Sequence, residues 1–148
     1  MNEHATLLYE WRQTRLKLKD DFSDKNLQNS IDFWKSVKYH QHGLDYDRPS
    51  TWPDVWEYIT EQHYTNSGHG IGCFYTVYHA RPDLNPEIWL IHDLLHGDMY
   101  LVCYVDGYIL NRMSGKLERY EDVKDDLDIL EKFTAEKVVN AVKERNSK

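Results

Sequence analysis

The sequence has few cysteines, glycines and prolines, and it has no long apolar run. Two Cys, seven Gly and four Pro occur among its 148 residues. Two cysteines are too few for the disulfide framework of a small secreted protein. No apolar stretch approaches the ~20 residues needed to cross a bilayer, and no signal-peptide pattern opens the chain. We therefore expect a soluble protein in the cytoplasm, of its own cell or of a host, with no membrane partner.

Positive charge is also scarce. Lys and Arg number 18 against 25 Asp and Glu, so the formal net charge is −7. Proteins that bind nucleic acid through phosphate contacts need a surplus of Lys and Arg, so direct nucleic-acid binding is not expected. Aromatic residues are abundant instead, with five Trp, eleven Tyr and four Phe. Tyr and Trp combine an apolar body with a polar tip, which suits cores that open onto protein-contact surfaces.

The length and pattern predict a single α+β domain over residues 1–148. It should be helical over 1–80, form a sheet over 87–113 and become helical again over 120–146. A chain of this length buries a sizeable core without disulfides or metals. We expect N-terminal helices packed on a short antiparallel meander of three or four strands, with a C-terminal helix.

Helical spacing dominates the first part of the chain. Leu7 to Arg15 predicts one helix, and Ser23 is placed to cap a second helix that runs to about Lys38. Thr51 resembles the cap of a third helix, which would bury one face over residues 52–59. We expect loops over 39–50 and 65–70, and a short helix or turn over 71–79.

A period of two begins at Glu87 and predicts strands near 87–92, 99–105 and 108–113. The dipeptide Asp106-Gly107 favours a type I′ turn, in which both residues take positive φ. The tail is expected to contain a helical turn or two from Glu121 to Leu127, followed by a helix capped by Thr134.

A cysteine hydrolase or transferase of the papain or transglutaminase type is the sharpest enzymatic hypothesis. Cys73, His96 and Asn111 occur in the required order, and such catalysis needs a thiolate facing an imidazole that an amide orients. The predicted turn argues against this site. If Val105 pairs with Tyr108, Asn111 lies opposite Val102, six residues from the histidine. At ~3.3 Å per residue this separation is about 20 Å, far beyond hydrogen-bond reach.

No metal or other cofactor is expected. The eight histidines form no HExxH motif and do not accompany paired cysteines. Acidic residues gather at 45–57 and 121–128, where turn chemistry and a solvated helix face explain them.

Three segments resemble a family of small, largely uncharacterised proteins of contractile-tailed bacteriophages. These are residues 52–57 (WPDVWE), 70–76 (GIGCFYT) and 104–111 (YVDGYILN), within a similarity that spans about residues 30 to 112. The resemblance implies a virion part of the neck, tail or baseplate, or a factor that acts in the host cytoplasm. That family carries no fixed cysteine at position 73.

We therefore interpret the chain as a non-catalytic phage protein that acts by protein–protein contact, most simply as a virion structural or assembly component. The alternatives are a cysteine hydrolase or transferase using Cys73, His96 and Asn111, and an inhibitor of a host protein. Partners would be phage structural proteins or a host protein. The expected contact surface is aromatic: Trp52, Trp56, Tyr58, Trp89, Tyr100 and Tyr104.

Overall fold

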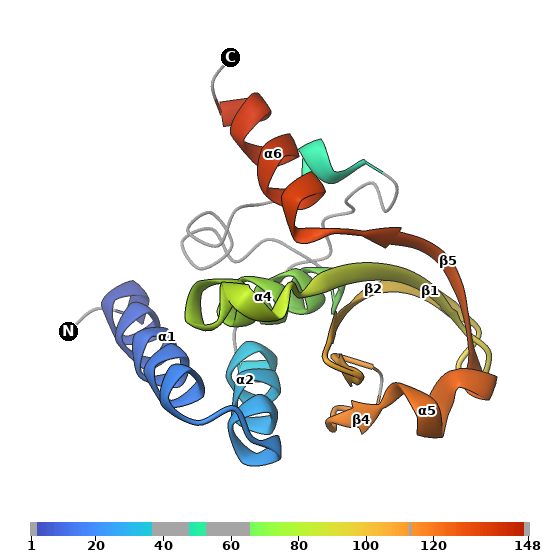
Figure 1. The fold of residues 1–148 in the computed structure, drawn as a ribbon, viewed down its shortest axis with the longest axis horizontal. Helices are drawn as coiled ribbons and strands as arrows, with labels where there is room; N and C mark the ends of the chain where they lie inside the picture. Colours follow the sequence, from blue (N-terminus) through green and yellow to red (C-terminus); the bar gives the residue numbers. More distant parts are fainter. Residues whose placement is uncertain (1–2, 37–47, 53–65, 113, 147–148) are drawn as a thin grey trace.

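The longer helices lie on one side of a curved five-stranded antiparallel sheet in the computed structural model, which describes residues 3–36, 48–52, 66–112 and 114–146 (Figure 1). The helices are α1 (Glu3–Asp20), α2 (Asp24–Ser36), α4 (Asn66–Ala80), α5 (Tyr120–Val123) and α6 (Ala135–Asn146). Short 3₁₀ helices span Pro49–Thr51 (η1), Pro82–Leu84 (η2) and Lys124–Asp126 (η3). The strands are β1 (Glu87–Asp93), β2 (Asp98–Val105), β3 (Tyr108–Leu110), β4 (Glu118–Arg119) and β5 (Leu127–Phe133).

The strand order is β4-β3-β2-β1-β5, so β1 and β2 lie at the centre and β5 returns to an edge. Asp106 and Gly107 have φ of 49° and 86°, and Val105 pairs with Tyr108 across them. The predicted tight turn and its register are therefore confirmed. Asp93 pairs with Asp98 at the other end of the central hairpin, where a second turn joins β1 to β2.

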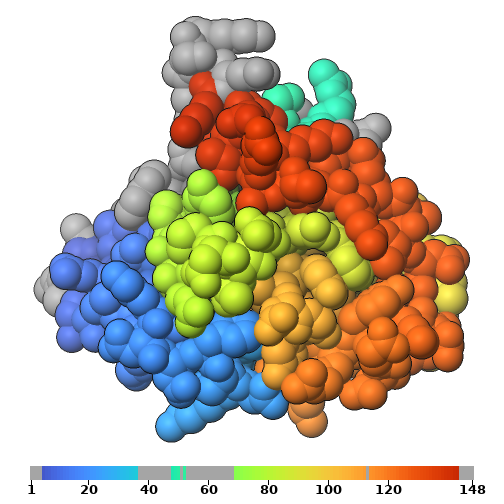
Figure 2. All heavy atoms as spheres, viewed as in Figure 1, coloured from blue at the N-terminus to red at the C-terminus, as the bar shows by residue number. Residues whose placement is uncertain are grey.

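Side-chain alternation divides the sheet into two packed faces. One face carries Ile88, Leu101 and Cys103, and it packs against α4 within the larger core. The other carries Trp89 and Val102, and it packs with the segment that follows β4 in a smaller cluster. In Figure 2, α4 lies at the centre of the visible face, between the N-terminal helices in blue and the C-terminal half in orange and red.

The three long N-terminal helices meet at the hydroxyl of Thr76 on α4. The indole N–H groups of Trp11 on α1 and Trp34 on α2 each donate to Thr76 Oγ1 over 2.9 Å. That hydroxyl donates in turn to the carbonyl oxygen of Gly72, also over 2.9 Å. One buried oxygen thus uses its donor and both acceptor positions, and it satisfies two indoles that have left water.

Two glycines of α4 allow this close packing. A Cβ on Gly72 would lie 2.4 Å from the ring of Trp34, and one on Gly70 would lie 2.5 Å from the carbonyl oxygen of Leu101. Neither contact is possible for a larger residue without movement of the neighbouring element. The glycine-rich segment is therefore helical because its small residues let α4 approach both α2 and β2.

The α+β class is confirmed, and so are several helix signals. Ser23 Oγ accepts from the amide of Asn26 at the start of α2, and Thr134 Oγ1 accepts from the amide of Lys137 at the start of α6. The predicted end of the second helix near Lys38 and most of the third predicted helix lie outside the described residues. No helix in the described parts of the chain is long and apolar enough to cross a membrane.

Three expectations for the elements are wrong. Helix α4 begins at Asn66 and takes in most of the loop predicted over 65–70. Strand β3 ends at Leu110 instead of 113, because Asn111 turns the backbone into the left-handed region with φ of 77°. The stretch Leu127–Phe133 is a fifth strand, where the sequence had suggested only a connection between helical segments.

Replacing Thr76 tests the three-helix junction. Thr76→Val keeps the shape but leaves two buried indole N–H groups without an acceptor, which should lower the free energy of unfolding by about 2–5 kcal/mol. Thr76→Ser keeps the hydroxyl and removes one methyl group, for a loss of about 1 kcal/mol. Urea denaturation of both variants measures the difference. Equal losses would show that the hydroxyl contributes nothing beyond its volume.

Candidate functional site

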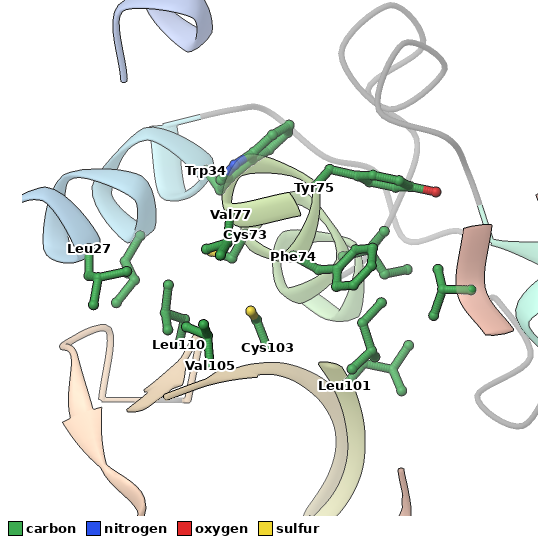
Figure 3. Close-up of a cluster of buried hydrophobic side chains, with 14 of the residues drawn as sticks. Leu27, Trp34, Cys73, Phe74, Tyr75, Val77, Leu101, Cys103, Val105 and Leu110 are labelled. Atoms are coloured by element: carbon green, nitrogen blue, oxygen red, sulfur yellow. The ribbon is translucent and has the colours of Figure 1, made fainter. Parts of the chain in front are cut away.

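Cys73 lies in the interior of α4, two turns after the helix begins at Asn66. Its side chain is fully buried, and Figure 3 shows it in the layer between α4 and the sheet, with Val77 beside it. Burial raises the pKa of the Cys73 thiol well above its usual range. The helix dipole acts mainly within the first turn, so it does not offset this effect. The thiol is held as a neutral apolar group.

The second thiol faces the same layer from the sheet. Cys103 on β2 is also fully buried and free (Figure 3). Burial raises the pKa of its thiol first, and the nearby Cys73 and Glu87 raise it further. A cation beside a thiol would have the opposite effect. The two cysteines therefore behave as small core residues that join α4 to β2.

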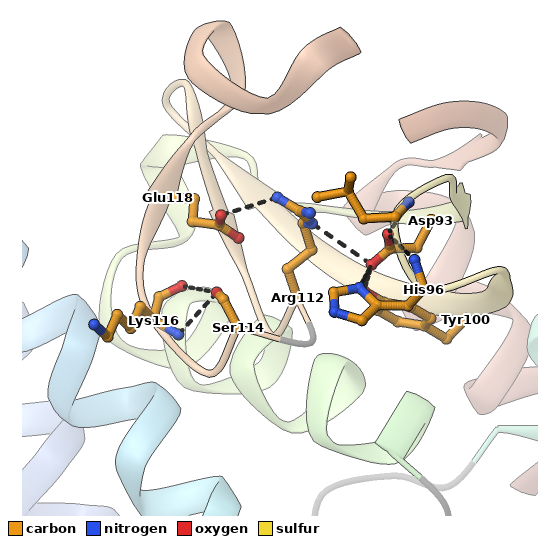
Figure 4. Close-up of polar contacts among 8 residues, drawn as sticks. Asp93, His96, Tyr100, Arg112, Ser114, Lys116 and Glu118 are labelled. Atoms are coloured by element: carbon orange, nitrogen blue, oxygen red, sulfur yellow. Dashed lines mark hydrogen bonds and ion pairs between the residues drawn. The ribbon is translucent and has the colours of Figure 1, made fainter. Parts of the chain in front are cut away.

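His96 lies in the turn between β1 and β2, where it contacts a buried carboxylate. Its Nδ1 is 2.9 Å from Oδ2 of Asp93, and the hydroxyl of Tyr100 donates to the same oxygen over 2.6 Å (Figure 4). Oδ1 of Asp93 accepts from the amides of Leu95 and His96 over 3.0 and 3.2 Å. The aspartate is fully buried, whereas the imidazole is about half exposed. We call this set, with Arg112, the Asp93 network.

Arg112 joins this network to the far edge of the sheet. Its Nε is 3.6 Å from Oδ2 of Asp93, and its Nη1 donates to Oε2 of Glu118 over 2.9 Å. Figure 4 shows the guanidinium between the two carboxylates. Burial opposes ionisation of Asp93, but the hydrogen bonds from Tyr100 and His96 and the charge of Arg112 outweigh it and hold the pKa of Asp93 at about 2. Asp93 is therefore a buried anion with a satisfied hydrogen-bonding shell.

The structure does not bring Cys73 and His96 together. Asp93, the partner of His96, has the same parity on β1 as Trp89 and Ile91, which belong to the face opposite α4. Cys73 packs on the α4 face. Along β2, the five residue steps from Asp98 to Cys103 add about 17 Å at ~3.3 Å per residue. This length of strand separates the core position of the thiol from the turn that carries the imidazole.

Asn111 directly follows β3. Leu110 before it pairs with Cys103, as the sequence predicted, but the pairing stops there because Asn111 takes a φ of 77°. The neighbouring Arg112, and not Asn111, reaches the hairpin turn at Asp93. The long side chain of Arg112 thus reaches a turn that lies beyond the paired part of β3.

The predicted aromatic contact surface needs correction. Trp52 is fully buried against Phe133, with ring centroids 4.9 Å apart. Trp89 and Tyr100 are also buried, the first stacked on half-buried Tyr104 and the second bonded to Asp93. These side chains are buried and not exposed because removing a large apolar ring from water stabilises the fold. Trp56 and Tyr58 lie outside the described residues.

A different exposed surface occurs at the turn between β1 and β2. Residues 94–99 are all exposed, and Leu94, Leu95 and Met99 retain 48%, 64% and 46% of their accessible area. We call residues 94–99 the hairpin tip. Single exposed apolar residues are common in proteins, but three within six residues are a concentration of exposed apolar area of the kind found at contact sites.

The Asp93 network and the hairpin tip were not predicted from the sequence. A signal existed, because an aspartate that caps the amides two and three residues ahead is typical of an Asx turn. Gly97, four residues after Asp93, supplies the positive φ of 77° that the turn requires. Arg112 gave no comparable signal, since its burial depends on the curvature of the sheet.

Comparison with known proteins informs the fold. No protein-family model and no curated protein sequence matches the chain. Among solved structures, calcium-bound Legionella pneumophila LapG is similar, with a TM-score of 0.75 and 17% identity over 92% of this chain and 78% of LapG. Two further structures of Legionella pneumophila LapG, one of them EGTA-treated, give TM-scores of 0.73 at 16% and 15% identity. They cover 98% of this chain and 90% and 91% of theirs.

This similarity supports a transglutaminase-like fold for the chain. It agrees in fold with the cysteine-hydrolase alternative and gives no support to a virion role. At this identity it concerns the fold alone, because one fold serves many unrelated functions. The resemblance to the phage family stays a prediction.

Asp93→Asn tests the buried anion. The variant leaves buried Arg112 beside a neutral amide, so we expect the free energy of unfolding to fall by about 3 kcal/mol at pH 7. Asp83→Asn is the matched control, because Asp83 pairs with Arg81 at an exposed position. Removing an exposed pair should change stability by less than about 1 kcal/mol. Comparable losses in the two variants would contradict the assigned role of Asp93.

The pH dependence gives an independent check. Because the pKa of Asp93 is depressed to about 2 in the folded chain, its contribution to stability is complete above the unfolded value of about 4. That contribution should disappear as the pH falls from about 4 to about 2. Urea titrations across this range should show the wild-type chain losing its advantage over Asp93→Asn. An advantage that stays constant down to pH 2 would show that the carboxylate is not preferentially ionised in the folded state.

Proposed function

We propose that this chain is a binding protein on a transglutaminase-like scaffold, acting by contact with a protein partner and not by thiol chemistry at Cys73. The burial of that thiol carries the proposal. A nucleophilic cysteine needs solvent access and a group that stabilises the thiolate. Cys73 is fully buried, burial raises the pKa of its thiol, and His96 contacts Asp93 at the turn between β1 and β2.

The start of α4 supports the same conclusion. A cysteine in the first turn of a helix is activated by the unpaired backbone amides and the dipole. The first turn here is formed by residues 66–69 (NSGH), and the sequence contains no other cysteine than Cys73 and Cys103. The scaffold therefore lacks a thiol at the position where this helix would activate one.

The hairpin tip supplies the positive argument for binding. It presents Leu94, Leu95 and Met99 to solvent on a turn that the Asp93 network fixes. Exposing three large apolar side chains costs solvation free energy, which contact with a partner would recover. The phage resemblance suggests that the partner is a phage or host protein.

A cysteine hydrolase or transferase is the second candidate, and the similarity in fold to LapG favours it. It would require α4 and the sheet to separate so that Cys73 meets a base. Among the described residues, no three His, Cys, Asp or Glu side chains are grouped so as to hold a metal ion.

Thiol alkylation separates the two candidates. In a Cys103→Ala variant, Cys73 is the single thiol, and it should react with iodoacetamide at pH 7 at least about 100-fold more slowly in the native chain than in urea. Cys73→Ala, which leaves Cys103, is the matched variant and should be similarly protected. Rapid native alkylation confined to Cys73 would establish an activated thiolate and favour the hydrolase.

Isolation of the chain from its source tests the binding role. The tagged chain should elute in size-exclusion chromatography with a stoichiometric protein partner, and Cys73→Ala should retain that partner, because the thiol takes no part in binding. A chain that elutes alone, together with a reactive Cys73, would replace the binding proposal with the enzymatic one.

A further inference from the structure

We propose that the hairpin tip is the docking site, and that it inserts into an apolar recess bordered by lysine and arginine residues on a partner protein. This inference rests on the proposed function and adds the surface and the chemistry of the partner. Leu94, Leu95 and Met99 supply the apolar centre, and a surrounding set of aspartates supplies the charge.

Backbone hydrogen bonds order the hairpin tip, and its apolar side chains take no part in them. The amides of Leu95 and His96 donate to Asp93 Oδ1, and the amide of Gly97 donates to the Asp93 carbonyl oxygen over 2.7 Å. On the other side, the amide of Leu94 donates to the carbonyl oxygen of Asp126 over 2.9 Å. The backbone of the turn is thus held in place while the two leucine side chains stay exposed.

Acidic residues border the tip on two strands. Asp98 belongs to the tip itself, and exposed Asp128 on β5 pairs with His92 beside it. Asp125 and Asp126 precede β5, next to the point where the backbone contacts Leu94. Two cations lie near these aspartates. Arg112 is buried between Asp93 and Glu118, and exposed Lys124, which precedes Asp125 in η3, pairs with Glu121 over 3.0 Å.

The aspartates around the hairpin tip favour a positively charged partner. A basic rim on the partner would pair with the aspartates and orient the apolar insertion. A second copy of this chain would bring another acidic tip and a net charge of −7, so like charges would oppose self-association. An anionic membrane surface would be repelled for the same reason. The observations therefore favour a basic protein partner.

Two labelled amphipathic peptides of equal length and leucine content can probe the tip, one with lysines on its polar face and one with glutamates. We expect fluorescence anisotropy to show binding of the lysine peptide only. The variant Leu94→Ser/Leu95→Ser/Met99→Ser should raise its Kd at least about tenfold. Leu8→Ser/Leu16→Ser is the matched control, because these leucines of α1 are also exposed, at 37% and 43%. It should leave the Kd unchanged.

A charge variant tests the rim and keeps the test valid if the serine variant does not fold. Asp98→Asn/Asp128→Asn should weaken binding of the lysine peptide more than the control Glu10→Gln/Asp20→Asn does. The control removes the same charge from exposed positions on α1. Added salt should lower the affinity of the lysine peptide for the wild-type chain more than its affinity for Asp98→Asn/Asp128→Asn. Equal binding of both peptides, equal effects of the paired variants, or a dimer of the chain that the tip variant abolishes would each overturn the assignment.

The outcomes separate this inference from the proposed function. A natural partner that co-purifies with both the wild-type chain and the serine variant would preserve the binding function and overturn the role of the tip. A partner lost only from the tip and rim variants would support both. A reactive Cys73 would instead remove the proposed function, independently of the peptide result.

Discussion

The hydroxyl of Thr76 is the point on which the helical half of the molecule depends. It accepts from the indoles of Trp11 and Trp34 and donates to Gly72, so it joins α1, α2 and α4 at one buried oxygen. An indole N–H that is buried without an acceptor is costly, so this position strongly restricts how the helices can pack. A separate contact fixes α4 against β2, because the backbone of Gly70 lies directly on Leu101. The depth of Cys73 follows from that contact.

This packing explains why a transglutaminase-like fold need not carry the corresponding chemistry. The residue that enters the helix–sheet layer two turns along α4 is shielded by the same contacts that stabilise the fold. Moving Cys73 into solvent would separate α4 from β2 and expose Phe74 and Leu101, which are also fully buried. Catalysis by this thiol would therefore have to overcome the free-energy cost of that opening.

Local signals gave much of the fold, and tertiary contacts decided the rest. The dipeptide Asp106-Gly107 determined the register correctly, since its turn geometry needs no information from elsewhere in the chain. Strand β5 was missed because charged residues such as Asp128 and Lys132, whose side chains are exposed, interrupt its apolar pattern. The start of α4 was missed because the local propensity of its residues favours a loop. Gly70 and Gly72 suggest a loop by propensity, and only the surfaces of Trp34 and Leu101 show why they are helical.

The candidate site depends on a similar combination of local and distant residues. Asp93 forms the turn with its own neighbours, but Arg112 from beyond β3 supplies the charge that stabilises the buried anion. The hairpin tip is therefore coupled to the far edge of the sheet through Arg112 and Glu118. A turn ordered in this way has already lost most of its conformational entropy during folding. Binding through Leu94 and Leu95 would then order mainly side chains, so more of the apolar contact would contribute to affinity.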